Sequence, residues 1–597
     1  MGTLKKYFYL LLPNERKQAY LLLGMILIMA ILDMLGVASI MPFISVLSNP
    51  ELIQTNSLLN NMFKFSGRFG IETSQQFLFA SGVFVFLLLI FSIAFKALTQ
   101  YVQIRFIAMR EYSLGKRLME GYLQHPYSWF LKRHSASISK TIIADVGTVI
   151  AKGFNPIMIL IAQSFVTLAL ITLLIIVEPM LTILVGFTLG SAYGLIYKLT
   201  KGYVTRIGKE TVKANLWRFT TISEAFGATK EIKVGGLEQI YIKRFSDPAK
   251  VIAQNATSSN IIGQLPRYAL EVITFGGMIL LVLYLMSKSG NFIDAIPIIA
   301  LFAFAGYRLM PSLQLIYSNA MLLRYSNPSL DTIVDDLKRF QPSSNNHKQV
   351  ALKMNDNITL KKIHYNYPGS SQTVLKDINL SIAANSTVGL VGATGSGKTT
   401  MVDIILGLLE AQQGALEVDG KPINKYNCRA WQKTIGYVPQ DIFLTDDTVA
   451  ANIALGIEQN EINQEAVERA AKISNLHNFV INELPLKYKT VIGERGVRLS
   501  GGQRQRIGIA RALYHDPQVL ILDEATSALD NLTEQAVMDA VHNLKKNITI
   551  VLIAHRLSTV KKCDKIFFIE KGKLKAQGTF EELRQNSDNF RANAENL

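Results

Sequence analysis

Long apolar segments alternate with polar, basic stretches through the first half of the chain. A helix that crosses a bilayer needs about 20 consecutive, mostly apolar residues. The third and fourth apolar segments are separated by a turn at Glu178 and Pro179, and the fifth and sixth by a few residues around Gly290. The pattern predicts six membrane spans, at Tyr20–Ile44, Phe77–Ala97, Ile157–Val177, Leu181–Ile196, Tyr268–Met286 and Phe292–Met310.

Lysine and arginine are distributed unevenly among the segments that connect these spans. They cluster before the first span, after the second and after the fourth, whereas the other connections contain few. Because basic loops stay on the cytoplasmic side of a membrane, both termini and the second half of the chain are expected in the cytoplasm.

Two of the basic stretches have a helical pattern of their own. Tyr101–Leu123 and Lys198–Phe226 contain no proline and keep apolar residues at helical spacing. We predict that they continue the second and fourth spans into the cytoplasm, and separate surface helices are the alternative. The segments at their tips, Pro126–Phe130 and Ser223–Glu231, are suited to docking onto another domain.

The one long outer connection, Leu47–Gln76, also contains apolar residues at helical spacing. Leu58 and Met62 lie four residues apart, as do Leu59 and Phe63. This spacing predicts a short amphipathic helix, which lies either on the membrane surface or against the protein itself.

The hydrophobic pattern changes in the second half of the chain. From about Val350 onward, strand-like runs alternate with helical patterns, which indicates an α/β domain. The polar stretch Phe340–Lys348 is typical of a linker. The predicted organisation is a transmembrane domain over residues 1–340, a linker over 341–349 and an α/β domain over 350–597.

Composition supports a membrane protein with a soluble portion. The 597 residues are too many for one core, 49% of them are hydrophobic, and the mean hydropathy is +0.23. The net charge of +17 lies largely beside apolar runs, which favours a membrane surface over nucleic acid. Cys428 and Cys563 imply neither a disulfide framework nor a metal cluster, and no cleaved signal peptide is expected.

A glycine-rich run, Gly392–Thr399, joins a predicted strand, Thr387–Val391, to a predicted helix, Thr400–Leu409. Glycine lets the backbone curl until its N–H groups face phosphate oxygens, and the helix N-terminus favours an anion. Lys398 can reach the β- and γ-phosphates, and the Thr399 hydroxyl can help to hold Mg²⁺. A chance glycine-rich turn is the alternative interpretation.

Further along, acidic and amide side chains follow predicted strands. Gln440 comes after the strand Ile435–Val438 and can touch Mg²⁺ or an attacking water. The apolar run Val519–Glu524 predicts a buried strand with Asp523 at its end as a Mg²⁺ ligand. Glu524, one residue beyond, can orient and deprotonate the hydrolytic water.

Three other features complete the series. Tyr367 precedes the glycine-rich run, and its ring can stack on adenine or be half-buried in a strand. Leu499–Gln503 opens a helix, so that Ser500, Gly501 and Gly502 form a second anion-binding N-terminus. His555 follows the predicted strand Ile548–Ile553 and can contact the γ-phosphate, although a lone histidine is usually structural.

The order of these motifs resembles the ATP-binding cassette (ABC) family. The resemblance implies a six-helix, all-α transmembrane domain of type IV exporter architecture and an α/β P-loop nucleotide-binding domain. It also implies that each ATP lies between Lys398 of one copy and Ser500 of another. Each motif occurs once, so the chain resembles a half-transporter that needs a second chain. No catalytic residue is degenerate, which permits a homodimer with two competent sites and makes it the expected partner, with a heterodimer as the alternative. Thr490–Gly496 is similar to an exporter segment that contacts the cytoplasmic helix tips.

The resemblance assigns expected roles residue by residue. The ATP ligands are Tyr367, Gly392, Gly395, Ser396, Gly397, Lys398, Thr399, Thr400, Ser500, Gly501, Gly502, Gln503 and Asp530, the last of them in the run Ser527–Asp530. The Mg²⁺ ligands are Thr399, Gln440 and Asp523, and the catalytic residues are Glu524, His555 and Gln440.

Three cations lie inside or beside the predicted spans, namely Lys96, Arg267 and Arg308. Charged groups are costly against lipid, so they are expected either to line a polar cavity or to pair with acids such as Asp33 or Glu271. We favour a cavity that receives an anionic head group, with internal pairing as the alternative.

Short runs narrow the resemblance further. Met41–Ile44, Leu265–Glu271 and Tyr307–Ser312 are similar to bacterial lipid-linked oligosaccharide flippases, in which basic cavity residues meet a pyrophosphate. The predicted function is ATP-driven flipping of such a substrate across the bacterial inner membrane. An exporter of lipid, glycolipid, peptide or drug is the alternative. A soluble regulatory ATPase is the alternative of another class, and six spans argue against it.

Overall fold

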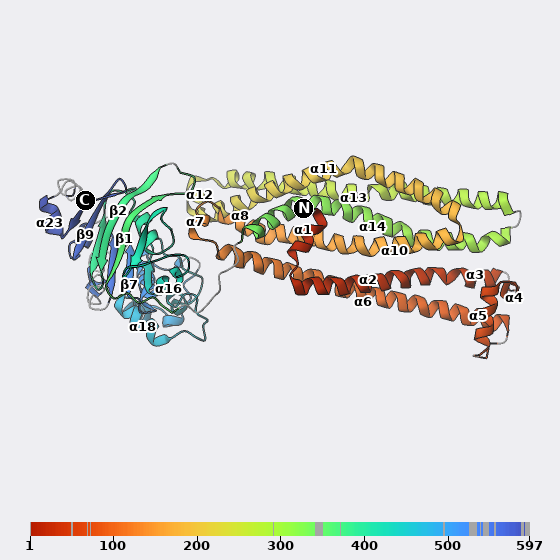
Figure 1. Cartoon of the computed structure of the whole chain (residues 1–597), viewed down its shortest axis with the longest axis horizontal. Helices are drawn as coiled ribbons and strands as arrows, with labels where there is room; N and C mark the ends of the chain where they lie inside the picture. Colours follow the sequence, from red (N-terminus) through yellow and green to blue (C-terminus); the bar gives the residue numbers. More distant parts are fainter. Residues whose placement is uncertain are drawn as a thin grey trace. The chain divides into compact units, whose positions relative to one another are not determined.

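The computed structural model describes residues 2–597 apart from 49, 51, 69, 72, 290–291, 341–349, 371, 494–495, 525–533, 538, 541–547, 555–556, 587–589 and 591–597. The chain forms two compact units (Figure 1). The first comprises Met1–His125 and Arg133–Pro342, and the second comprises Pro126–Lys132 and Ser343–Leu597.

The first unit is entirely helical in its described part. Its long helices lie side by side in Figure 1, where α11 packs on α13, and α10 and α13 pack on α14. Its elements are α1 (Thr3–Leu10), α2 (Pro13–Ala38), α3 (Ile40–Ser48), α4 (Leu52–Thr55), α5 (Ser57–Gly67), α6 (Ser74–Leu123), α8 (Ser135–Lys140), the π-helix η1 (Thr141–Asp145), α9 (Val146–Val149), the π-helix η2 (Ile150–Phe154), α10 (Asn155–Val177), α11 (Pro179–Gly227), α12 (Thr229–Gly235), α13 (Glu238–Ser289) and α14 (Phe292–Arg339).

The two predicted extensions of the second and fourth spans are confirmed as continuous helices. α6 contains 50 residues and runs through Tyr101–Leu123 without a break, and α11 contains 49 and runs through Lys198–Phe226. At about 1.5 Å per residue, each is more than twice the thickness of a bilayer core. The predicted turn between the third and fourth spans is also confirmed, because α10 ends at Val177 and α11 begins at Pro179.

Within the described residues, four helical stretches are long and apolar enough to cross a membrane. They are Pro13–Leu47, Ser74–Leu123, Ser135–Val177 and Thr182–Gly227, and they contain the first four predicted spans or most of them. α13 and α14 run through the fifth and sixth predicted segments. Most side chains of those two segments, and positions 290–291 between them, lie outside the described residues.

The first predicted span differs from the structure in one respect. It is two helices, α2 and α3, which meet at Ser39. Pro42 in the first turn of α3 explains the break, because proline has no N–H to bond back to residue 38. The amphipathic helix predicted in the outer connection is α5, and it packs against the protein: Leu59 is buried, and the Phe63 ring meets Phe77 edge-on.

The second unit contains two sheets. The smaller has the strand order β2-β1-β4-β5 and is antiparallel, and the larger has the order β10-β9-β3-β8-β7-β6. In the larger sheet the strands from β9 to β6 are parallel. The strands are β1 (Asn357–Asn366), β2 (Thr373–Ala383), β3 (Thr387–Val391), β4 (Gln413–Val418), β5 (Lys421–Pro422), β6 (Ile435–Val438), β7 (Val519–Asp523), β8 (Thr549–Ile553), β9 (Lys565–Glu570) and β10 (Lys573–Gly578).

Short helices flank these sheets. One of them, α7 (Tyr127–Phe130), comes from the first half of the chain, where it forms part of the segment Pro126–Lys132. The others are α15 (Lys398–Ile405), α16 (Cys428–Gln432), α17 (Val449–Ile453), α18 (Gln464–Ile473), α19 (His477–Glu483), the 3₁₀-helix η3 (Lys487–Lys489), α20 (Gly501–Leu513), α22 (Leu557–Val560) and α23 (Phe580–Asn586).

The predicted strands before the motifs are confirmed as β3, β6, β7 and β8. All residues of β3, β7 and β8 are buried, as their continuous apolar runs indicate. The carboxyl ends of parallel strands share one edge of a sheet, and ligands bind there in open α/β folds. This edge therefore brings together motifs that are far apart in the sequence.

Candidate nucleotide-binding site

The glycine-rich loop after β3 has a backbone that only glycine can form. Gly397, which caps α15, has φ +106, a conformation that side chains rarely adopt. A Cβ at Gly392 would overlap the carbonyl oxygen of Ile569. The loop therefore curls tightly in front of the N-terminus of α15, as a phosphate-binding loop requires.

The helix after the loop differs slightly from the prediction. α15 begins at Lys398 and ends at Ile405, whereas the apolar pattern extends to Leu409. Gly407 has φ +66, and the next amide, that of Leu408, donates to the carbonyl of Asp403. A left-handed glycine with such a bond ends a helix, and the apolar residues beyond it join the core as a turn.

Lys398 lies over the loop that precedes it. Its ammonium donates to the carbonyl oxygens of Gly392 at 2.7 Å and Ala393 at 3.1 Å. Burial lowers the pKa of Lys398 below its usual range, while the charges of Glu524 and Asp523 act in the opposite direction. The ammonium is thus held at the loop, next to the acidic end of β7, where phosphates and Mg²⁺ would meet.

Glu524, the acidic residue that follows β7, is hydrogen-bonded to Gln440, which follows β6. The Gln440 Nε2 donates to the Glu524 Oε2 at 2.9 Å, although 84 positions separate them. The strands β6 and β7 are parallel neighbours, so their carboxyl ends coincide. Glu524 has φ +48, a strained conformation that costs about 1–3 kcal/mol and turns the chain sharply at the end of the strand.

Asp523 lies at the end of β7 and is buried. The Tyr437 hydroxyl forms a hydrogen bond with its carboxylate, and burial raises the pKa of that phenol. A buried carboxylate held by a neighbour is a suitable hard ligand for Mg²⁺. Thr399 is exposed at the start of α15, so its hydroxyl is accessible to the same ion.

Tyr367 follows β1 and is half-buried. Its hydroxyl lies 2.9 Å from the Thr400 hydroxyl, and its ring packs edge-on against Tyr365. The structure thus brings this tyrosine to α15, at a residue two positions after Lys398. Stacking on adenine stays a prediction for this ring.

The run Leu499–Gln503, here called the signature run, begins a capped helix, as predicted. Ser500 caps α20: the Gln503 amide donates to the Ser500 hydroxyl at 3.2 Å, and the Ser500 amide donates to the Gln503 side chain at 2.8 Å. This reciprocal capping box leaves the amides of Gly501 and Gly502 at the helix N-terminus. Asp530 and His555 lie outside the described residues, so their predicted roles stay predictions.

The sequence analysis missed one acidic residue of this site, Asp403. It is buried on α15, and burial together with the nearby charge of Asp523 raises its pKa to about 6. Its position one turn after Thr399, on the helix that starts at the phosphate loop, is the signal that would have identified it.

We expect Asp403→Asn to stabilise the protein at pH 7.5 in the absence of nucleotide and magnesium. The raised pKa means that the folded state holds this proton more tightly than the unfolded state, so wild-type stability falls as pH rises from about 4 to about 6. Asparagine does not ionise and avoids this loss, which is about 1–3 kcal/mol. Thermal unfolding at pH 4.5 and 7.5 measures it. The exposed control Asp446→Asn is expected to change little, and a gain independent of pH would contradict the assignment.

The described residues fit a magnesium nucleotide. The loop supplies a glycine cradle, Lys398 a cation, Thr399 and Asp523 oxygen ligands, and Glu524 a base. The Ser396 hydroxyl oxygen is buried and has no hydrogen-bond partner among the described residues, so it can donate to a phosphate. Bound Mg²⁺ would supply charge neutralisation for the phosphates and a fixed position for the attacked phosphoryl group.

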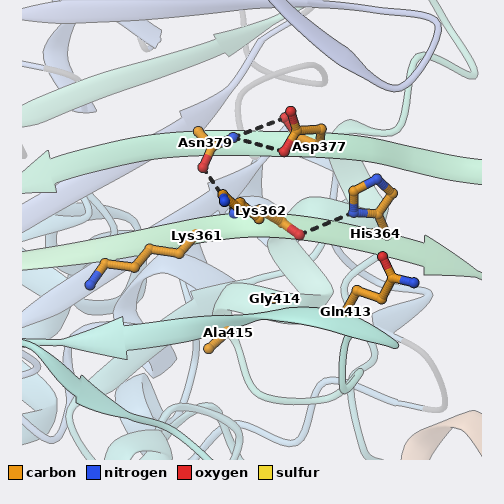
Figure 2. A pocket seen from close by; sticks show the side chains of 8 residues that line it. All are labelled: Lys361, Lys362, His364, Asp377, Asn379, Gln413, Gly414 and Ala415. Carbon is orange, nitrogen blue, oxygen red and sulfur yellow. Dashed lines mark hydrogen bonds between the residues drawn. The ribbon is translucent and has the colours of Figure 1, made fainter.

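A separate hollow of about 570 Å³ lies on the small sheet, and Figure 2 shows hydrogen bonds among some of its polar residues. Asn379 donates to Asp377 and accepts from the amide of Lys362. No predicted site residue contributes to this hollow. Its lining residues are Lys361, Lys362, His364, Asp377, Asn379, Gln413, Gly414 and Ala415.

In the first, helical unit, two of the three cations that were predicted to line a cavity are paired with acids. Internal pairing is the alternative that the sequence analysis left open. Lys96 lies 3.5 Å from Asp33, which is buried and also accepts from the Ser92 hydroxyl. Arg267 lies 3.0 Å from Glu271, one turn along α13. Both cations stay partly exposed, with 40% and 55% of their side chains accessible. The Arg308 side chain lies outside the described residues.

Comparisons with known proteins agree with this geometry. Residues 375–527 match the family described as ABC transporter. The chain is 30% identical over 487 residues to the ATP-dependent lipid A-core flippase of Alkalilimnicola ehrlichii, covering 79% of this chain and 80% of that one. It is also 30% identical over 494 residues to the Escherichia coli K12 protein of the same name, with 79% and 80% coverage.

A solved structure supports the fold over the whole length. A bacterial Atm1-family ABC exporter with ATP bound superposes with a TM-score of 0.78 and 22% sequence identity, covering 97% of this chain and 98% of that chain. The two-unit architecture, the P-loop site on the sheet edge and the relatives identified above lead to one conclusion. The chain belongs to the ABC transporter family, as an exporter-type half-transporter that couples ATP hydrolysis to transport.

Proposed function

We propose that this protein flips a phosphorylated, sugar-bearing lipid across the bacterial inner membrane, and specifically a polyprenyl-pyrophosphate oligosaccharide. The observation that carries the proposal is the similarity over four-fifths of the chain to proteins named lipid A-core flippases. Those names describe ATP-dependent flipping of lipid A-core. The short runs around Met41, Arg267 and Arg308 favour the lipid-linked oligosaccharide among such substrates.

The proposed working unit is a homodimer. Each motif occurs once in the chain, so a second signature helix has to come from another copy. The amides of Gly501 and Gly502 lie at the N-terminus of α20, and this end of the helix would complete an ATP site on that copy. At the tip between α11 and α13, Phe226 and Val234 are 75% and 91% exposed, which suits an interface.

The proposed orientation places both termini and the nucleotide unit in the cytoplasm. It rests on the basic residues before the apolar part of α2, after the apolar part of α6 and along the second half of α11. ATP would join two nucleotide units, and hydrolysis would separate them. In this cycle the segments Pro126–Phe130 and Ser223–Glu231 transmit the movement to the membrane helices.

The proposed head-group ligands are Lys96, Arg267 and Arg308. A phosphate that approaches the exposed edge of Lys96 or Arg267 would compete with Asp33 or Glu271 for the cation. Such an exchange keeps the cation paired both with and without substrate, which limits the desolvation cost.

The experiment is a flipping assay with the full chain in proteoliposomes and three cargo arms. The first arm contains a polyprenyl-pyrophosphate oligosaccharide, the second contains lipid A-core, and the third contains a neutral phospholipid or peptide. Faster ATP hydrolysis and flipping in the first arm support the proposal. Activity confined to the second arm identifies a lipid A-core flippase, and activity confined to the third refutes an anionic substrate.

We expect Arg267→Gln and Arg308→Gln to raise the concentration of phosphorylated lipid needed for half-maximal ATPase stimulation by about tenfold, because one charge-assisted hydrogen bond contributes about 1.5–3 kcal/mol. Basal hydrolysis without lipid should stay unchanged. Lys116→Gln is the matched control, since Lys116 is also an exposed, helix-paired cation. Unchanged stimulation by every anionic lipid in both arginine variants would exclude these cations as ligands.

A further inference from the structure

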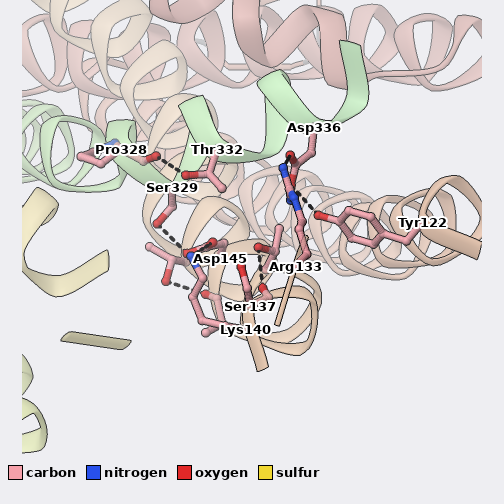
Figure 3. A network of polar contacts seen from close by, with 12 residues as sticks. Tyr122, Arg133, Ser137, Lys140, Asp145, Pro328, Ser329, Thr332 and Asp336 are labelled. Atoms are coloured by element: carbon pink, nitrogen blue, oxygen red, sulfur yellow. Dashed lines mark hydrogen bonds and ion pairs between the residues drawn. The ribbon is translucent and has the colours of Figure 1, made fainter. Parts of the chain in front are cut away.

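Both ends of the segment Pro126–Lys132 are held by one carboxylate of α14. Tyr122 lies just before the segment and donates its hydroxyl to Asp336 Oδ2 at 2.6 Å. Arg133 follows the segment directly and donates to Asp336 Oδ1 at 3.1 Å and Oδ2 at 3.4 Å. Figure 3 shows the side chains of Tyr122 and Arg133 both reaching Asp336.

This arrangement is buried and therefore holds its geometry. The Asp336 side chain is 6% exposed, and Tyr122 is 1% exposed. A buried carboxylate is stable only while charged and polar partners satisfy it. The bidentate contact with the guanidinium of Arg133 also fixes the orientation of both groups.

An aromatic contact stabilises the same place, where Tyr122 and Arg133 bind Asp336, which is called the joint below. Phe340, which follows α14, packs edge-on against Tyr122 with ring centroids 5.2 Å apart, and it meets His125 at 5.4 Å. A Cβ at Gly121 would overlap the Phe340 ring, so this glycine allows the ring that follows α14 to pack closely against the end of α6. The joint is thus both polar and close-packed.

A second buried contact joins α14 to the helices after the segment. Lys140 lies 2.5 Å from Asp145, and their side chains are 5% and 1% exposed. The Ser329 hydroxyl donates to the same aspartate at 3.2 Å. Ser329 lies about two turns before Asp336 on α14, so polar contacts at two separate positions hold this helix against its neighbours (Figure 3).

We propose that Asp336 is a positioning residue that couples movement of the segment Pro126–Lys132 to α14. The segment belongs to the nucleotide unit by its contacts, while both of its flanks belong to the helical unit. Tyr122 and Arg133, at the two ends of the segment, both bind the carboxylate of Asp336 on α14. A displacement of the segment therefore moves α14 as well, instead of only bending the chain at the two ends of the segment. The first part of α14 is the sixth predicted span, so a movement of Asp336 near the other end of this helix is transmitted to the span.

The test uses hydrogen–deuterium exchange of the full chain in lipid nanodiscs, with and without ATP and vanadate. One peptide over Gly392–Thr399 reports nucleotide trapping, and another over the turn at Glu178 reports the far end of the bundle. In the wild type, both peptides are expected to change their exchange on trapping. In Asp336→Asn, protection of the phosphate loop should persist, while the change at Glu178 should fall at least fivefold.

Two further variants keep the test decisive. Tyr122→Phe removes one donor and leaves the Arg133 contact, so it should show a partial loss at Glu178 even if Asp336→Asn does not fold. Asp331→Asn is the matched control, because Asp331 lies on the same helix in a more exposed pair with Lys6. A wild-type response at Glu178 in both folded variants, equal to that of the control, would overturn the proposal and leave the joint a purely structural contact.

Discussion

Glu524→Gln is expected to reduce ATP hydrolysis by about 10²–10⁴-fold while ATP still binds. An amide does not accept a proton at neutral pH, so the water that attacks the γ-phosphate loses its base. The shape of the side chain and its contact with Gln440 are largely kept, since the two lie 2.9 Å apart in the wild type. Phosphate release in a single turnover measures the loss.

The same variant should retain ATP after rapid desalting, because nucleotide is bound but not consumed. The exposed control Glu458→Gln, which lies in the same unit, should hydrolyse ATP at the wild-type rate. Normal turnover in Glu524→Gln would remove this residue from the role of general base and direct attention to Gln440 and His555.

Lys398→Ala is expected to lower hydrolysis by about 10²–10³-fold and, unlike Glu524→Gln, to prevent retention of ATP. The ammonium is the cation that the structure places at the phosphate loop, so its removal takes positive charge away from the site of the phosphates. The substitution also leaves the carbonyls of Gly392 and Ala393 without their donor, which loosens the loop.

Equilibrium binding of a fluorescent ATP analogue separates the two variants. Glu524→Gln should bind it as the wild type does, and Lys398→Ala should bind it at least tenfold more weakly. Lys573→Ala removes an exposed lysine from the same unit and serves as the control. If Lys398→Ala bound and retained ATP normally, the loop would not be the phosphate site.

Much of this architecture could be predicted from local patterns. The strand β3 matches its predicted bounds because every residue from Thr387 to Val391 is buried and the next residue is glycine. The long helices α6 and α11 were predicted because apolar spacing continues through their basic ends without proline. Such signals depend on neighbours within a few residues, which a sequence displays directly.

Other features depended on partners far away in the chain. The raised pKa of Asp403 arises from burial and from the charge of Asp523, which is 120 positions later in the chain. The outer helix α5 was predicted, but whether it faced lipid or protein was decided by Phe77 on α6. In the same way, Lys96 is paired because Asp33, 63 positions earlier in the chain, lies within reach.

The sequence by itself determined the ABC motifs, the apolar spans and the positions of the glycines, because each of these is a property of a short stretch of chain. Only the tertiary structure decided that Gln440 bonds to Glu524. It also decided that Tyr122 and Arg133, on either side of the segment Pro126–Lys132, both bind Asp336. The physical reason is that a parallel sheet and a helical bundle bring together residues separated by 84 and by more than 200 positions. Hydrogen bonds and ion pairs act only over that final short distance.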